Sequence, residues 1–345
     1  MQRKHLAILL ILSLYLLLTV IPASADEEIQ YGLTADEIEA YELPDFEQLT
    51  VDESMLYDRR YQQVAQRIDV FDAPNGNYLR SLDEGFNFLT VLQVADGWTE
   101  INRGEWVQSS ALADTNYVVS HFTGVFLEDQ YPEYAFAWML INAYPSSSPG
   151  ADPDEANSLV YRYTLVHIFA IVEIDGWEWY QIGADLWVHQ TYVGKALPIE
   201  RPEDVTTEKW VAIDLYEQTL MVYEGDRPIF ATLIATGLPR WPTFEGTFNI
   251  YYRRTRHTMS WGTVGDDFYY LEEVPWTMFF DEGRALHGAY WHDGFGYRRS
   301  HGCVNMTITD ANWLYNWVAE DFESFNSPDI EEGPNVHVYS SGVYQ

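Results

Sequence analysis

The sequence consists of short strand-like segments separated by tight-turn dipeptides, and this alternation is the strongest constraint on its fold. Turn signals stand at Pro74-Asn75-Gly76 and Asp96-Gly97, each between runs of alternating apolar and polar residues. A convincing helical pattern is confined to Thr307–Val318, where Thr307 and Asp310 have the spacing of a capping box. We therefore predict a mainly β protein with one main helix.

A short motif occurs twice. "ADGWTEINRGEWVQ" at 95–108 and "IDGWEWYQIGADLWVH" at 174–189 share an Asp-Gly-Trp turn followed by Trp-Val. Two such copies indicate a duplicated small β-domain. The motif resembles the end of the bacterial Src-homology-3-like barrel. This resemblance implies two small SH3-like β-barrels, at 61–115 and 120–195, the second with a loop insertion at 143–158. It also implies contact between these repeats and the glycan of a cell wall.

The first 25 residues have the features of a secretory signal. Arg3 and Lys4 precede an apolar run, Leu6–Ile21, and Ala23-Ser24-Ala25 forms a small-x-small cleavage site. We predict export to the cell wall or another extracytoplasmic site, with an uncleaved anchor as the alternative. The further divisions expected are an acidic leader at 26–60 with a short helix at 35–41, a linker at 196–207, and a β-rich C-terminal domain at 208–341.

The chain is strongly acidic. It has 53 Asp and Glu against 19 Lys and Arg, a formal net charge of −34. Such a surface repels phosphate backbones and anionic lipid, so we expect neither a nucleic-acid partner nor a strong membrane partner. A local exception is the cluster Arg253, Arg254 and Arg256. These arginines form either a solvated face or a docking site for substrate carboxylates.

Cys303 is the only cysteine, so an internal disulfide is impossible. A lone cysteine is either a passive buried residue or a reactive group. Its neighbours favour reactivity, because His287, His292 and His301 lie within a span of fifteen residues that ends just before it.

The chemistry of this cluster is that of a nucleophile. A thiolate attacks carbonyl carbon, and a nearby imidazole accepts the thiol proton and holds the two groups as an ion pair. The imidazole needs an acceptor for its second nitrogen so that the correct tautomer faces the sulfur. Gly302 lacks a β-carbon, which lets a substrate carbonyl approach and lets backbone amides point at the developing oxyanion.

At these residues the sequence resembles the L,D-transpeptidases of YkuD-like fold. The family's signature is a His-Gly pair, a spacer, and Ser/Thr-His-Gly-Cys followed by an aliphatic residue and Arg or Asn. Here it reads His287-Gly288 and then "SHGCVN" at 300–305. The resemblance implies that Cys303 is the nucleophile and His287 the proton carrier, oriented by the Gly288 carbonyl. It also implies an oxyanion hole from the amides of Gly302 and Cys303, and loop support from Ser300 and His301.

The same resemblance implies a reaction. Cys303 would attack a peptidoglycan stem peptide at its third residue, release terminal D-Ala, and pass the acyl group to an amine of a second stem, giving a 3→3 cross-link. With water as acceptor the enzyme would be an L,D-carboxypeptidase. No cofactor or metal is expected. Candidate substrate contacts are Met259, Tyr270, Trp276 and Asn305, together with the three arginines at 253, 254 and 256.

Three alternatives stay open. His287, His292, His301 and Cys303 include enough nitrogen and sulfur donors for a metal, although their spacing matches no standard zinc pattern. A papain-like wall endopeptidase would place its histidine after the cysteine, where only His337 is available. A wall-binding protein that has lost catalysis would not need to retain His287 and Cys303.

Overall fold

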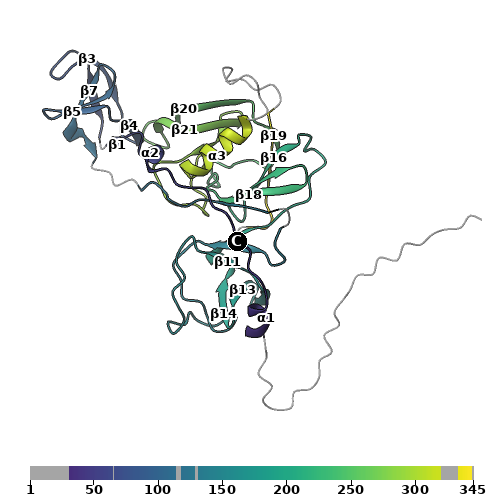
Figure 1. Ribbon diagram of the computed structural model, residues 1–345. Coiled ribbons are helices and arrows are strands. Elements are labelled where there is room, and N and C mark those ends of the chain that lie inside the picture. The colour runs from purple at the N-terminus through teal and green to yellow at the C-terminus, as the bar shows by residue number, and fades with distance from the viewer. Residues whose placement is uncertain (1–30, 65, 114–117, 129–130, 320–332, 344–345) are drawn as a thin grey trace, which may run out of the picture. The chain divides into compact units, whose positions relative to one another are not determined.

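The computed structural model describes residues 31–64, 66–113, 118–128, 131–319 and 333–343 (Figure 1). The expected signal peptide at 1–25 lies outside these residues. From Gly32 onward the chain forms one compact unit. Within the described ranges, no helix has the length and apolar character needed to cross a membrane.

A six-stranded sheet forms one side of the C-terminal part, with strand order β19-β24-β16-β17-β18-β9. The strands are β9 (Val125–Phe126), β16 (Lys209–Asp214), β17 (Thr219–Glu224), β18 (Arg227–Leu233), β19 (Gly246–Asn249) and β24 (Asn335–Tyr339). Every residue from Trp210 to Asp214 in β16 is buried, and the strand pairs in parallel with β24 on one side and antiparallel with β17 on the other. A strand buried on both faces reads as a continuous apolar run, which accounts for the sequence of β16.

A seven-stranded sheet has the order β23-β22-β21-β4-β1-β8, with β20 also paired to β21. Its strands are β1 (Tyr61–Val64), β4 (Phe86–Thr90), β8 (Leu112–Ala113), β20 (Tyr252–Trp261), β21 (Tyr269–Asp281), β22 (Arg284–Gly288) and β23 (Val304–Met306). Three of these strands come from the segment expected to be the first barrel. They pair with one another, and β4 pairs in parallel with β21. The first barrel segment therefore contributes strands to the same sheet as β20–β23.

The helix α3 (Ile308–Ala319) lies where the sequence predicts it, and it packs against β21 and β22 (Figure 1). One buried cluster combines side chains from this helix and from both sheets. Its members include Val211, Leu220, Met278, Leu286, Val304, Leu314 and Val338. The end of β22 and the start of β23, which carry the His-Gly and Cys motifs, therefore stand on a rigid core.

The two copies of the repeated motif form the same local structure. In each copy an Asp-Gly pair has both φ angles positive, at Asp96 and Gly97 (50° and 80°) and at Asp175 and Gly176 (54° and 82°). Positive φ at both central positions is the signature of a type I′ hairpin turn. The paired strands are β5 (Gln93–Ala95), β6 (Trp98–Asn102) and β7 (Glu105–Gln108) in one copy, and β12 (Ala170–Ile174), β13 (Trp177–Gly183) and β14 (Leu186–His189) in the other.

The expectation of two closed barrels is not met in the described residues. The first copy belongs to an open five-stranded sheet, β3-β2-β7-β6-β5, and the second to two three-stranded sheets, β12-β13-β14 and β11-β10-β15. The remaining elements are β2 (Ile68–Phe71), β3 (Tyr78–Leu82), β10 (Phe136–Met139), β11 (Leu165–His167) and β15 (Val193–Ala196), with 3₁₀ turns η1 (Ser109–Ala111) and η2 (Gln190–Tyr192). The first copy does not close into a barrel because β1, β4 and β8 pair in the seven-stranded sheet.

The leader and linker are both attached to the folded body. In the leader, α1 (Ala35–Glu39) has a complete capping box between Thr34 and Glu37, and α2 (Glu53–Leu56) follows. In the linker, the backbone N–H groups of Thr206 and Thr207 donate to Oδ1 of Asn335 at 2.7 and 3.0 Å. The linker is therefore held against β24.

The first turn of α3 contains a buried carboxylate. The hydroxyl of Thr307 accepts from the Asp310 amide at 3.1 Å, as a cap does. The Asp310 carboxylate accepts from the Gly124 amide at 3.1 Å and from the Thr232 hydroxyl at 2.5 Å. Burial raises the pKa of Asp310 to about 6. This side chain therefore ties the helix to β18 and to the segment before β9.

We expect Asp310→Ala to lower the free energy of unfolding by about 2–4 kcal/mol, because it leaves two buried donors without an acceptor. Asp310→Asn keeps an oxygen and should lose less. Urea denaturation at pH 7 measures both variants. Equal stability of Asp310→Ala and the parent would contradict this role.

Candidate active site

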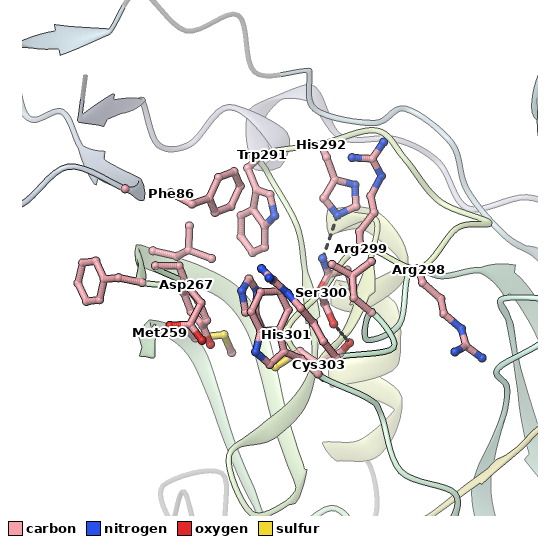
Figure 2. A pocket seen from close by; sticks show the side chains of 18 of the residues that line it. Phe86, Met259, Asp267, Trp291, His292, Arg298, Arg299, Ser300, His301 and Cys303 are labelled. Carbon is pink, nitrogen blue, oxygen red and sulfur yellow. Dashed lines mark hydrogen bonds between the residues drawn. The ribbon is translucent and has the colours of Figure 1, made fainter. Parts of the chain in front are cut away.

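The sheet register brings the two motifs together. Strands β22 and β23 pair in parallel, with His287 opposite Asn305, so Cys303 lies immediately before the paired segment. His287 and Cys303 line one cavity of about 810 Å³. His287 is 2% exposed and Cys303 is 8% exposed. Figure 2 shows Cys303 and His301 in the middle of this cavity.

The imidazole of His287 is held in one tautomer. Its Nδ1 lies 3.1 Å from the Gly288 carbonyl oxygen, which can only accept, so Nδ1 carries the proton. The lone pair is then on Nε2. Burial lowers the pKa of His287 to about 4, so the ring is neutral at pH 7.

The thiol of Cys303 is protonated at rest. Burial raises its pKa, and the Ala285 amide and the Arg284 guanidinium oppose that shift only in part. Its hydrogen-bond acceptor among the described residues is the Gly283 carbonyl, 4.0 Å from Sγ. A raised thiol pKa beside a lowered imidazole pKa favours a neutral pair. This corrects the expectation of a thiolate–imidazolium ion pair.

Ser300 fixes the loop that carries the cysteine. Its Oγ accepts from the Gly302 amide at 3.0 Å and donates to the Cys303 carbonyl at 2.5 Å. Gly302 has φ of +113°, a conformation that favours glycine. Because the Gly302 amide already donates to Ser300, the expectation that it serves an oxyanion hole needs correction.

His301 forms an aromatic wall of the cavity. Its ring stacks on Trp241 with centroids 3.8 Å apart, and Tyr269 lies at 4.9 Å. The Arg240 guanidinium also lies over the Trp241 ring, 3.5 Å from its centroid. His301 thus shapes the cavity beside the thiol.

Two of the expected substrate contacts, Met259 and Asn305, line the cavity, and two others do not. Tyr270 lines a separate small cavity and its hydroxyl donates to Glu272. Trp276 packs on Tyr315 of α3, 5.4 Å between ring centroids. Both expectations are corrected, since strand β21 directs these rings away from the thiol.

The arginine cluster is likewise absent from the cavity lining. Arg253 is 4% exposed and donates to the Tyr315 carbonyl. Arg254 donates to the Tyr252 hydroxyl, and Arg256 forms an ion pair with Asp58. These contacts attach β20 to its neighbours, and the docking-site hypothesis for the cluster stays a prediction.

His292 has both ring nitrogens engaged within the protein. Nδ1 accepts from the Gly294 amide at 3.0 Å, and Nε2 lies 2.9 Å from the side-chain amide of Asn305. Burial lowers the pKa of His292 to about 3. Within the described part of the chain, no three His, Cys, Asp or Glu side chains are placed to hold a metal ion. The metal-site alternative therefore lacks a ligand set there.

Several residues of the site were not identified from the sequence. The Thr243 hydroxyl accepts from the Gly237 amide at 3.0 Å and donates to the Gly302 carbonyl at 2.9 Å. The Arg284 Nε donates to the Pro242 carbonyl at 3.1 Å, beside Gly302. For Arg284, the sequence signal that could have identified it was its position three residues before His287. Phe86, which lines the cavity, had no such signal, because it comes from a distant segment of the chain.

The C-terminal segment is similar to known proteins. Residues 208–337 match the family model described as the L,D-transpeptidase catalytic domain, YkuD. YciB of Bacillus subtilis, provisionally assigned to the L,D-transpeptidases by its name, is 26% identical over 136 residues. That match covers 35% of this chain and 66% of YciB, so just under two thirds of the relative is spanned.

Solved structures include an L,D-transpeptidase from Stackebrandtia nassauensis, 26% identical, with a TM-score of 0.29 over 41% of this chain and 60% of that one. The catalytic domain of the Enterococcus faecium L,D-transpeptidase is 22% identical, with a TM-score of 0.32 over 39% of this chain and 98% of that one. The assignment of the segment rests on the family match.

A neutral thiol–imidazole pair predicts the pH dependence of alkylation. The rate of Cys303 modification by iodoacetamide should rise about tenfold per pH unit from pH 6.5 to 8.5, because only the thiolate reacts and the raised pKa keeps it scarce. Mass spectrometry of the intact protein follows the reaction, with N-acetylcysteine as the reference thiol. A rate that is already constant from pH 6 would indicate an ion pair instead.

Proposed function

We propose that this chain, whose residues 208–337 are a YkuD L,D-transpeptidase catalytic domain by family match, is a peptidoglycan L,D-transpeptidase that forms 3→3 cross-links through a thioester on Cys303. One observation carries the proposal. The sole thiol and a neutral imidazole with Nε2 unprotonated line the same cavity.

The first half-reaction is acylation. The Cys303 sulfur attacks the carbonyl carbon of the third stem residue as the thiol proton passes to Nε2 of His287. The C–N bond to terminal D-Ala breaks, and His287 returns the proton to the departing amine. The Cys303 amide is the remaining candidate donor to the oxyanion, since the Gly302 amide is engaged by Ser300.

The second half-reaction is transfer. An amine of a second stem attacks the thioester carbonyl, and His287 accepts a proton from it. The C–S bond breaks, the sulfur regains the proton, and an amide joins the two stems. Water in place of the amine would give an L,D-carboxypeptidase, which releases the acyl group as a carboxylate.

We further propose that the protein acts outside the cytoplasm, at the cell wall. The support is the charge and cleavage pattern of residues 1–25 and the substrate itself, which lies outside the membrane. The repeated hairpins are proposed as SH3-like wall contacts, on the basis of the shared Asp-Gly-Trp and Trp-Val residues.

The test is cross-linking of a purified stem tetrapeptide by the parent protein, Cys303→Ala and His287→Ala. We expect the cysteine variant to form no dimer and the histidine variant to lose about 100-fold or more in rate. His337→Ala is the matched control, because its imidazole bonds to Thr247 outside the cavity.

Product analysis decides between the reactions. Dimeric product supports transpeptidation, and tripeptide with free D-Ala alone supports the carboxypeptidase. Dimer formation by Cys303→Ala would overturn the assignment. A carbapenem should leave one covalent adduct on the parent protein and none on Cys303→Ala.

A further inference from the structure

Part of the cavity wall comes from outside the segment that matches the catalytic family. Glu84, Gly85 and Phe86 line the same cavity as Cys303 and His287. They stand at the start of β4, which pairs in parallel with β21, and Phe86 lies opposite Tyr269 in this register. Figure 2 shows Phe86 beside Trp291 at the edge of the cavity.

Phe86 is the exposed end of a row of aromatic rings. Phe88 is two residues along β4, so both rings lie on the same face of the strand, 5.3 Å apart between centroids. Phe88 is 4% exposed and packs edge-on to Tyr290 at 5.9 Å. Phe86 is 43% exposed. The Phe86 ring therefore contacts the buried core through Phe88, whereas its own surface is partly exposed at the cavity.

The position of this ring is well supported. Tyr61 of β1 stacks on Tyr290 with centroids 3.5 Å apart, and the Tyr290 hydroxyl donates to the Glu272 carbonyl at 2.9 Å. The side-chain Nδ2 of Asn87 in β4 donates to the Asp83 carbonyl in the preceding turn at 2.7 Å. A β-carbon on Gly85 would lie 3.1 Å from the carbonyl oxygen of Phe268, the residue just before β21. The turn before β4 therefore packs closely against the backbone that leads into β21.

The cavity has different chemistry at its two ends. Its lining includes the acidic residues Glu84, Asp266 and Asp267 together with Arg240, and Figure 2 draws Phe86, Met259 and Asp267 on one side of Cys303. Arg298 and Arg299 lie at the other end, with Cys303 between the two ends (Figure 2). An aliphatic chain that ends in an ammonium group matches the first end, because its methylenes would cover the ring and its charge would face carboxylates.

We propose that Phe86 is a specificity-determining residue that binds the aliphatic side chain of the diamino acid in a stem peptide. The identity of the ligand rests on the proposed function, whereas the place of the ring in the cavity does not. The N-terminal strands then take part in substrate recognition in addition to completing the sheet.

The direct test is calorimetric binding of a stem tetrapeptide with lysine at its third position, in the inert Cys303→Ala background. We expect Phe86→Ser to raise the dissociation constant about tenfold, the scale of a buried aromatic contact. Phe86→Tyr, which keeps the ring, should bind like the parent. Leu92→Ser is the matched control, since Leu92 is 54% exposed in the same region and does not line the cavity.

A second measurement separates recognition from folding. In the Cys303-containing protein, Phe86→Ser should raise KM while kcat, the melting temperature and the iodoacetamide rate stay unchanged. Equal affinity of Phe86→Ser and the parent, no binding by the parent, or a parallel fall in the iodoacetamide rate would each overturn the proposal. If the peptide binds as expected and the parent makes no dimer, the proposed function fails and the role of Phe86 stands.

Discussion

The parallel pairing of β22 with β23 is the constraint on which the site depends. It sets His287 opposite Asn305 and starts the second strand one residue after Cys303. Both strands are anchored in the core through Leu286, Val304 and Met306. A one-residue slip in this pairing would turn the apolar side chains of these strands to the opposite face of the sheet. The register that buries them therefore also fixes the positions of His287 and Cys303.

Burial then determines the protonation states. It lowers the pKa of His287 and raises that of Cys303, so each group is held in its neutral form. The Gly288 carbonyl selects the tautomer that leaves Nε2 as the base. In the proposed reaction, such a neutral pair would transfer its proton during attack on the carbonyl carbon.

The N-terminal region has a structural role in the seven-stranded sheet. Strands β1, β4 and β8 extend that sheet, Tyr61 supports the loop after His287 through Tyr290, and Phe86 reaches the cavity. The repeated Asp-Gly-Trp hairpins keep their local form within open sheets. The seven-stranded sheet and the cavity therefore both include residues outside the segment 208–337 that matches the family model.

The sequence alone predicted the features that depend on residues close together in the chain. Alternating strands, the Asp-Gly turns, the helix after Thr307, and the grouping of Cys303 with His287 all depend on neighbours in the chain. The tertiary structure decided what depends on distant contacts. The Gly302 amide donates to Ser300, the arginines of β20 bond to residues such as Asp58 and Tyr315, and Phe86 reaches the cavity from a distant segment of the chain. Strand pairing and burial join segments without any local signal, so no motif in the sequence could reveal them.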